Sequence, residues 1–319
     1  MTKKKEPVQP ISGTKVPRFA GPSTFARLPE LRDVGSCDVA IVGIPFDAAT
    51  SYRPGARFGP QSIRQASRHL RTNYHPNYDV EPFKVQQVAD AGDITCNPFN
   101  IDEAIKQIEA GVLDLLKKTK GIISLGGDHT IAFPLLRAMN KLNNGPVALV
   151  HFDAHLDTWD TYFGAPYTHG TPFRRAREEN LFLDDSSMHV GIRGPLYSKE
   201  DLKNDESFGF KIIHCDEFQS QGVDKIVERI RNRVGNNPLY LSIDIDVLDP
   251  AHAPGTGTPE IAGMTSREMV NVIRGLSGMK IISADVVEVA PAYDHAEVTS
   301  LAAATIVYEL TNLFAKAKR

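Results

Sequence analysis

Cysteine and tryptophan are scarce in this sequence. Its 319 residues include one tryptophan and three isolated cysteines, Cys37, Cys96 and Cys215. An odd number of widely spaced cysteines argues against a disulfide framework and against a cysteine-based zinc site. A chain of this length buries most of its surface without such cross-links, so we expect an ordinary packed core.

A net charge of one sign and a long apolar run are also missing. The 36 Lys and Arg residues nearly balance the 39 Asp and Glu residues, which gives a formal net charge of −3. This balance provides no electrostatic reason to bind nucleic acid or an anionic membrane. No apolar run reaches the roughly 18 residues of a membrane span, and the basic start at residues 1–10 has no apolar stretch behind it. We therefore expect a soluble, cytoplasmic protein without a secretory signal.

The first 36 residues differ from the rest of the chain. Residues 1–36 contain five prolines and show little periodicity, which predicts an irregular arm laid over a neighbour or a partner subunit. From residue 37 onward, apolar runs alternate with helical periods, without an internal repeat or a linker. We therefore predict a single α/β domain over residues 37–319.

The apolar runs have the pattern of strands that are covered on both faces. They lie at residues 37–47, 121–127, 146–155, 188–194, 210–217, 238–247 and 279–290. Helical spacing appears at residues 101–118, 265–276 and 300–318. The second helix opens with Thr265 and has Glu268 three residues later, the signature of a capping box. Alternating strands and helices predict a parallel sheet with helices on both faces.

Metal-ligating side chains gather where the predicted strands end, which is where ligands bind in doubly wound sheets. These residues are His129, Asp153, His155, Asp157, Asp244 and Asp246, and the last long strand ends at Glu288. Asp153, His155 and Asp157 are two residues apart, so an extended backbone projects them to one face. Asp244 and Asp246 repeat this spacing on another strand. Two imidazoles and four carboxylates suit Mn²⁺ rather than thiol-preferring Zn²⁺, and they fit a two-metal site.

Some of these features also have a purely structural interpretation. A lone histidine at a strand end is more often a hydrogen-bonded structural residue, but burying so many carboxylates without a cation would be costly. We place His151 on the opposite face from the ligand triplet and interpret it as structural. Asp249 and Asp285 are interpreted as packing, cap or turn residues. The segment at 255–260 lacks the third glycine of a dinucleotide-binding loop, so a nucleotide site is not expected there.

From about residue 16 onward, ordered motifs resemble the ureohydrolase family of arginases, agmatinases and their relatives. The motifs are GGDH (126–129), DAHLD (153–157), SIDIDVLDP (242–250), APGTGTPE (253–260) and DVVEVAP (285–291). SYRPGARFGPQSIR (51–64) and HGTPFRRA (169–176) resemble the agmatinase branch in particular. The resemblance implies a three-layer α/β/α sandwich around a mostly parallel eight-stranded sheet, usually assembled as trimers or hexamers. It also implies hydrolysis of a guanidinium group to urea and an amine at a binuclear manganese site.

The resemblance gives the candidate residues specific roles. One manganese ion is expected to bind His129, Asp153, Asp157 and Asp244. The other is expected to bind Asp153, His155, Asp244 and Asp246, so that Asp153 and Asp244 are shared. Glu288 resembles the glutamate that binds the guanidinium group, and Thr258 resembles the hydroxyl residue that orients it. His169 resembles the histidine that passes a proton to the leaving amine.

Two positions concern the choice of substrate. Trp159 stands where arginases carry an asparagine for the α-carboxylate, and Leu196 falls near the position of the aspartate that engages the α-amino group. Both departures argue against L-arginine. Trp159 could lie against an aliphatic tail or narrow the pocket for a shorter guanidine. We expect agmatine as the substrate, with guanidinobutyrate, guanidinopropionate or free guanidine as alternatives and Ni²⁺ as the alternative metal.

Two other classes of function stay open. A deacetylase-like amidohydrolase on a related fold would normally use one zinc ion and two adjacent histidines, and this sequence has no such pair. A non-enzymatic regulatory or pseudoenzyme subunit would not need the complete set of predicted ligands together with His169 and Glu288. A guanidino hydrolase with agmatinase-like specificity is therefore the main hypothesis.

Overall fold

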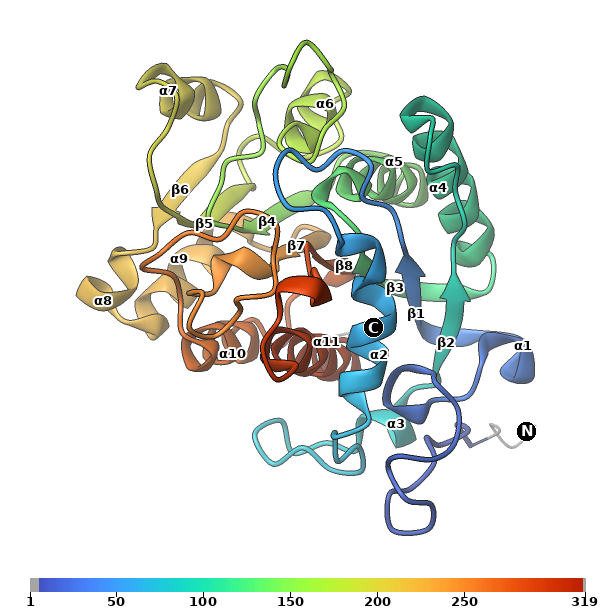
Figure 1. Cartoon of the computed structure of the whole chain (residues 1–319). Coiled ribbons are helices and arrows are strands. Elements are labelled where there is room, and N and C mark those ends of the chain that lie inside the picture. Colours follow the sequence, from blue (N-terminus) through green and yellow to red (C-terminus); the bar gives the residue numbers. More distant parts are fainter. Residues whose placement is uncertain (1–5, 318–319) are drawn as a thin grey trace.

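An eight-stranded sheet forms the middle layer of the computed structural model, which describes residues 6–317 (Figure 1). The strands are β1 (Cys37–Ile44), β2 (Val88–Asp93), β3 (Thr119–Gly126), β4 (Ala148–Phe152), β5 (Met188–Ile192), β6 (Lys211–His214), β7 (Leu239–Asp244) and β8 (Ile281–Val287). They stand in the order β2-β1-β3-β8-β7-β4-β5-β6, and every neighbouring pair runs parallel. The apolar pattern misses β2, because its sequence VADAGD contains two aspartates and a glycine at the sheet edge.

Helices cover both faces of the sheet and complete three layers (Figure 1). The α-helices are α1 (Leu31–Val34), α2 (Gly59–Ser67), α3 (Pro82–Val85), α4 (Ile101–Leu116), α5 (Ala132–Asn143), α6 (Pro172–Glu178), α7 (Glu200–Ser207), α8 (Glu217–Gln221), α9 (Val223–Val234), α10 (Ser266–Gly275) and α11 (Val298–Lys316). Short 3₁₀ helices lie at Phe25–Arg27, Ala56–Phe58, His129–Ile131, Ile245–Val247 and Pro291–Tyr293. Helices α4, α5 and α6 pack on one face, and α2, α9, α10 and α11 pack on the other. The predicted three-layer α/β/α sandwich is confirmed.

Side chains cap the N-termini of helices α4 and α10. In α10, the Thr265 hydroxyl accepts the Glu268 N–H at 3.1 Å, and the Glu268 carboxylate accepts the Thr265 N–H at 2.8 Å. This pair is the predicted capping box, which satisfies two backbone donors at the helix start. Asn100 caps α4 in a simpler way, by accepting the backbone N–H of Glu103.

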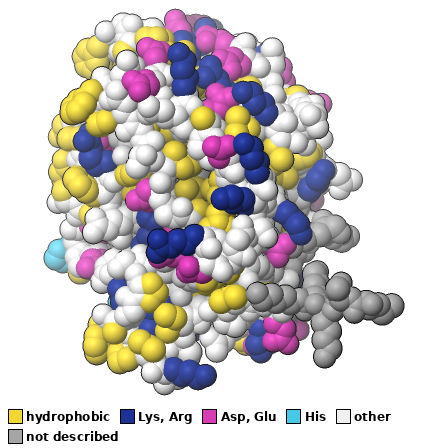
Figure 2. Space-filling view, turned by 90° about the vertical axis from the view of Figure 1, so that its right-hand side faces the viewer, with side chains coloured by type: hydrophobic (Ala, Val, Ile, Leu, Met, Phe, Trp, Pro, Cys, Tyr) yellow, Lys and Arg dark blue, Asp and Glu magenta, His cyan; other side chains and the backbone are white. Residues whose placement is uncertain are grey.

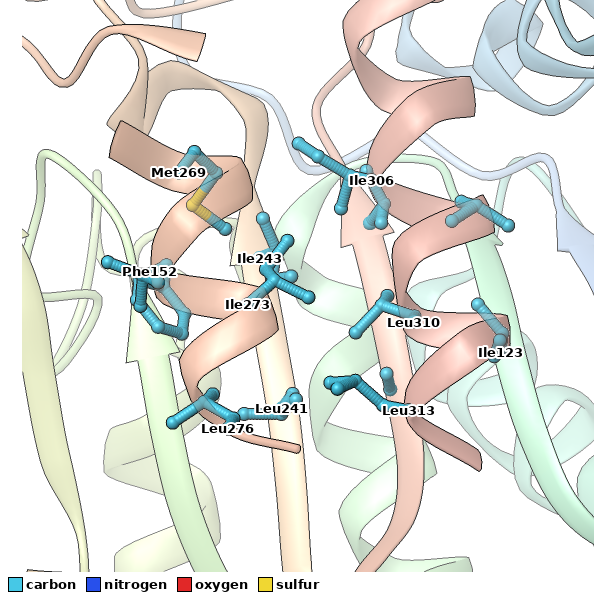
Figure 3. Packing of buried hydrophobic residues seen from close by; sticks show 14 of the residues in the cluster. Ile123, Phe152, Leu241, Ile243, Met269, Ile273, Leu276, Ile306, Leu310 and Leu313 are labelled. Carbon is cyan, nitrogen blue, oxygen red and sulfur yellow. The ribbon is translucent and has the colours of Figure 1, made fainter. Parts of the chain in front are cut away.

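Aliphatic side chains from α10, α11 and the strands interlock to form the core on one face (Figure 3). Ile273 of α10, Leu310 of α11, Ile243 of β7 and Phe152 of β4 belong to this one cluster, and all four are fully buried. Burying a large apolar side chain contributes about 1.5–3 kcal/mol relative to leaving it exposed. The core therefore fixes β4 and β7, whose ends carry several of the candidate ligands.

Helix α11 qualifies the expectation that no segment could span a membrane. Its 19 residues are long and apolar enough to cross one by composition, but 72% of that segment is buried inside the protein. Leu310 and Leu313, for example, pack against the sheet. In this structure α11 is a core helix.

The described part of the N-terminal arm, residues 6–36, packs along the sheet edge formed by β2. Phe25 and Leu28 are buried in the same core as the sheet. The Phe25 N–H donates to Asp90 Oδ2 at 2.7 Å, and Glu30 forms a β-bridge with Asp90. The arm thus covers an edge of its own chain. Residues 1–5, with most of the basic start, lie outside the described residues.

The molecular surface mixes charges of both signs. Figure 2 shows Lys and Arg side chains interspersed with Asp and Glu on the face that it presents. A mixed face of this kind does not produce the extended positive potential that attracts a polyanion.

Candidate metal centre and active site

Four neighbouring strands bring the candidate residues together. Strands β3, β8, β7 and β4 are consecutive in the sheet. Their carboxyl ends lead to His129, Glu288, Asp244 and Asp153 respectively, and parallel strands place these ends at one edge. Asp157 and Glu288 have φ angles of 55° and 63°. Non-glycine residues in this region cost about 1–3 kcal/mol and are often found at functional sites.

His129 is the centre of a first cluster. Its Nδ1 atom lies 2.9 Å from Asp157 Oδ2, 3.2 Å from Asp153 Oδ2 and 3.3 Å from Asp244 Oδ2. Nδ1 is nevertheless a buried atom without a hydrogen-bond partner. Burial lowers the pKa of His129, but the three carboxylates raise it well above its ordinary value. The surroundings of His129 Nδ1 therefore favour a positive charge.

Hydrogen bonds through Ser242 and Asp285 fix the other ring nitrogen of His129. Its Nε2 lies 2.9 Å from Ser242 Oγ, and the Ser242 hydroxyl donates to Asp285 Oδ1 at 2.8 Å. Because this hydroxyl gives its proton to Asp285, it accepts from His129 Nε2, and this bond directs Nδ1 toward the carboxylates. Asp285, which also accepts from Tyr240, does more than pack: it orients a candidate ligand.

His155 is the imidazole of a second cluster. Its Nδ1 lies 3.2 Å from Asp153 Oδ1 and 3.2 Å from Asp246 Oδ2. Asp153 turns Oδ2 toward His129 and Oδ1 toward His155, so it lies between the two clusters. Asp244 Oδ1 accepts the backbone N–H of Asp246 at 2.8 Å, and its Oδ2 faces His129.

The side chains of both clusters fit divalent cations. Burial and the neighbouring carboxylates raise the pKa of Asp246 to about 6 and that of Asp244 well above its ordinary value. The negative charges therefore destabilise one another unless a cation lies among them. The unpartnered Nδ1 of His129 is a donor atom ready for such a cation. A set rich in carboxylates with a minority of imidazoles suits a hard or borderline divalent ion.

His151 lies on the same side as the ligand triplet, so its predicted placement on the opposite face is wrong. Residues 151 and 153 are two apart in extended backbone and therefore share a face. His151 Nε2 is 2.7 Å from Asp153 Oδ2, and its Nδ1 is 2.7 Å from His189 Nδ1. Burial lowers the pKa of His151 to about 3, so the ring is neutral at physiological pH. With both nitrogens engaged by side chains, His151 is not free to act as a ligand.

Glu288 and His169 form a buried pair beside the clusters. Glu288 Oε1 accepts the backbone N–H of His129 at 2.9 Å and lies 3.2 Å from His169 Nδ1, whereas Oε2 has no hydrogen-bond partner. Burial lowers the pKa of His169, but Glu288 raises it to about 9. Ser51 holds the far nitrogen of His169, with 2.6 Å between the Ser51 hydroxyl and Nε2. The only sequence signal for Ser51 is its place in the SYRPGARFGPQSIR motif.

A cavity of about 660 Å³ lies over this pair and the clusters. His155, Asp157 and His169 line its inner part. Thr258 lines it as well, with its hydroxyl 3.5 Å from Asp246 Oδ2. Two candidate ligands, His155 and Asp157, thus share one cavity with the candidate substrate residues Trp159, His169 and Thr258.

Aromatic side chains form an outer wall of the cavity. Trp159 meets Tyr162 and Tyr197 edge-on, with ring centroids 5.6 and 5.7 Å apart. Its indole N–H faces Asp201 Oδ2 at 3.4 Å. The uncharged Leu196 lines the same cavity. No sequence pattern identifies the two tyrosines, because they come from separate loops and meet only in the folded chain.

Comparison with known proteins gives a consistent answer. The arginase family model matches residues 37–312. Guanidinopropionase from Pseudomonas aeruginosa is 43% identical, over 97% of this chain and 96% of that protein. Mitochondrial agmatinase from Gallus gallus is 40% identical, over 94% of this chain and 88% of that protein. The solved structure of proclavaminate amidino hydrolase from Streptomyces clavuligerus superposes with a TM-score of 0.90 at 40% identity, covering 95% of this chain and all of that one.

The fold and the buried carboxylate–imidazole clusters define a metal-dependent hydrolase built on a parallel sheet. The chain belongs to the arginase family. It is a hydrolase that acts on the C–N bonds of guanidino compounds and releases urea. The motif resemblance is thereby confirmed, and the chain is placed among enzymes rather than non-enzymatic subunits.

Proposed function

We propose that this guanidino hydrolase cleaves agmatine to putrescine and urea with two bound Mn²⁺ ions. One ion would be held by His129, Asp153, Asp157 and Asp244. The other would be held by Asp153, His155, Asp244 and Asp246. The carboxylate-rich donor set favours Mn²⁺, with Ni²⁺ as the alternative.

The observation that carries this proposal is the unpartnered oxygen of Glu288. Glu288 is 1% exposed, and its Oε2 accepts no hydrogen bond. Leaving a buried carboxylate oxygen unpaired is costly, and a planar guanidinium group offers N–H donors that match a carboxylate. Because the His129 N–H and the His169 ring hold Oε1, Oε2 is the atom left to receive the substrate.

Each residue of the inner cavity has a separate role in the reaction. The chemistry that two bound divalent cations supply is the activation of water near neutral pH. Glu288 binds and orients the guanidinium group. His169, whose pKa is raised to about 9 beside Glu288, carries a proton at neutral pH and donates it to the leaving amine. Ser51 holds the His169 ring in place from Nε2.

The outer wall supports agmatine over L-arginine. The faces and edges of Trp159, Tyr162 and Tyr197 can contact an aliphatic chain and attract a terminal ammonium group. Neither Trp159 nor Leu196 offers a partner for the α-carboxylate and α-ammonium of an amino acid. Thr258, at the inner end of this wall, supplies a hydroxyl near Asp246 to orient the guanidinium end.

Guanidino acids are the second candidate substrate class. Arg53 lines the same cavity, with its guanidinium carbon 4.9 Å from the centre of the Tyr293 ring. This cation could attract the carboxylate of 3-guanidinopropionate or 4-guanidinobutyrate, and one relative is a guanidinopropionase. Free guanidine, which has no tail, is a third candidate if Trp159 narrows the cavity.

Urea release from a substrate panel tests the proposal. The purified protein is stripped with a chelator, reloaded with Mn²⁺ or Ni²⁺, and assayed with agmatine, the two guanidino acids, guanidine and L-arginine. We expect the highest kcat/KM for agmatine with Mn²⁺. Preference for a guanidino acid would overturn the substrate assignment, and higher activity with Ni²⁺ would overturn the metal assignment.

We also propose that the protein works in the cytoplasm as a homo-oligomer, a trimer or a hexamer. The motif resemblance supports the assembly, and the composition supports the location. Sedimentation velocity at micromolar concentration tests the assembly: a single monomer peak would contradict it.

A further inference from the structure

A row of buried polar side chains leads from Asp153 to helix α7. It consists of His151 on β4, His189 on β5 and Asp205 on α7, each with an exposed fraction of 0%. The reaction described above uses none of these three residues. Burying polar groups in this way is costly unless their mutual contacts fix them.

The side chains in the row lie close to one another. His151 Nε2 lies 2.7 Å from Asp153 Oδ2, and the two Nδ1 atoms of His151 and His189 are 2.7 Å apart. His189 Nε2 then lies 3.1 Å from Asp205 Oδ2. The row ends at Thr158, whose hydroxyl donates to Asp205 Oδ1.

The direction of the hydrogen bonds follows from proton counting. An ionised Asp153 can only accept, so neutral His151 donates from Nε2 and keeps its lone pair on Nδ1. Only one proton fits between the two Nδ1 atoms, so His189 is its donor. His189 Nε2 and Asp205 Oδ2 are both buried atoms without a hydrogen-bond partner.

We propose that His189 is a positioning residue: its Nδ1–H fixes the tautomer of His151, and His151 fixes the rotamer of Asp153. The inference rests on the proposed function, because Asp153 matters here as the ligand between the two clusters. Asp153 directs one oxygen to each cluster. Any rotation of this carboxylate therefore disturbs both ion sites together.

Loss of the His189 donor has a specific consequence. His151 would be free to move its proton to Nδ1, and its Nε2 lone pair would then face Asp153 Oδ2 across 2.7 Å. The repulsion would turn the carboxylate away from the geometry that the ions need. Loss of residues that orient metal ligands typically costs 10–100-fold in metal affinity.

Packing is the competing explanation for these histidines. The His189 ring lies on Phe210 with centroids 3.8 Å apart, and the His151 ring lies 4.3 Å from that of Phe173. A test must therefore separate the donor from the shape. Asn and Leu share one branched shape, and only Asn retains an N–H donor near the Nδ1 position. His189→Asn and His189→Leu form a matched pair.

Calorimetric titration with Mn²⁺ provides a readout that does not depend on activity. Metal-stripped wild type, His189→Asn and His189→Leu are titrated, and thermal unfolding of each stripped protein checks the fold. We expect the Mn²⁺ dissociation constant to rise about 10–100-fold in His189→Leu and to stay within about threefold of wild type in His189→Asn. With saturating Mn²⁺, His189→Leu should lower kcat more than it raises KM, because Glu288 and the outer wall bind the substrate.

A second pair, His151→Gln and His151→Met, applies the same comparison one step nearer to Asp153. Gln keeps a donor near the Nε2 position and Met does not, so the Gln variant should bind Mn²⁺ more tightly. This pair decides the question if His189→Leu fails to fold. Equal Mn²⁺ affinities within the pairs would overturn the positioning role alone. Absence of Mn²⁺ uptake by the wild type, or unchanged uptake by Asp153→Asn, would overturn the proposed metal centre as well.

Discussion

The inner and outer ends of the candidate active-site cavity are built in different ways. At the inner end, His129 and Asp153 are fully buried where β3 and β4 end. At the outer end, Tyr197 and Phe163 are 77% and 97% exposed on loops. The inner end is charged and fixed by the sheet, whereas the outer end is aromatic and fixed by few contacts.

This contrast indicates which properties each end can control. Moving an inner side chain would require moving a strand that is packed in the core, so its geometry is tightly set. A loop can change its residues without disturbing that core, and binding specificity often resides in such loops. We therefore expect inner substitutions to impair the reaction with every guanidine, and outer differences to change which guanidine is preferred.

Asp246→Ala should have the largest effect, because it removes a carboxylate from the second cluster while leaving the packed core intact. We expect the metal content to fall toward one ion per chain and kcat/KM to fall by about 1,000-fold or more for all substrates. Elemental analysis and urea release measure both. Asp249→Ala is the control, since Asp249 accepts from Ala251 N and Gly263 N in a turn. Two retained ions with near-normal turnover in Asp246→Ala would contradict the assignment.

Glu288→Gln tests the inner end without removing a ligand. Gln keeps the shape and the acceptor for the His129 N–H but loses the charge that faces the guanidinium group. A charge-assisted hydrogen bond contributes about 1.5–3 kcal/mol, so we expect kcat/KM to fall by about 100-fold while the metal content stays at the wild-type level. Loss of bound metal instead would place Glu288 among the ligands.

The sequence predicts the inner end far better than the outer end. Asp153, His155 and Asp157 form a local pattern at the end of an apolar run, and strand order brings them to His129 and Asp244. The apolar pattern also locates seven of the eight strands and misses only edge strand β2, where polar residues interrupt the pattern. The missed strand β2 is an outermost strand of the sheet and carries none of the candidate site residues.

What the sequence does not predict depends on contacts between distant segments. The bond from Ser242 to Asp285 and the row through His189 and Asp205 join side chains of different strands and helices. The aromatic wall likewise forms only when two loops meet. The wrong placement of His151 has a different cause, because it does not depend on distant segments. Side chains alternate along an extended strand, so the spacing of two residues already places His151 on the same face as Asp153.

Discrimination against L-arginine tests the outer end. Its α-carboxylate and α-ammonium must lose water on entering the cavity. Neither Trp159 nor Leu196 pairs with them, and Arg53 in the same cavity could pair with the carboxylate alone. An unpaired buried charge costs several kcal/mol. We expect kcat/KM for L-arginine to be at least about 100-fold below that of the best guanidine without this head group. Preference for L-arginine in the same assay would contradict the interpretation of the outer wall, although the inner end would be unaffected.

The smallest effect concerns the stability of the metal-free protein between pH 6.5 and pH 9. The pKa of His169 is raised to about 9 because Glu288 outweighs the effect of burial, and burial together with Glu288 raises the pKa of Asp128 to about 7. Both groups hold their protons more tightly in the folded state than in the unfolded state. Their stabilising contribution is therefore present at low pH and is lost as the pH rises through these values. The lowered pKa of His151, about 3, acts in the opposite direction but only below pH 6.5.

We therefore expect the thermal midpoint of the stripped protein to fall by a few degrees from pH 6.5 to pH 9, since 1 kcal/mol corresponds to about 2–4 °C in chains of comparable size. Addition of Mn²⁺ should flatten this dependence. In the stripped protein bound protons neutralise the carboxylates, and a bound cation would supply this positive charge instead. His169→Asn should weaken the pH dependence without metal, which assigns the lost part of the effect to this residue. A thermal midpoint that rises with pH in the stripped wild type would contradict this expectation. It would mean that the carboxylates of the inner end do not repel one another, and the contrast with the aromatic outer wall would be lost.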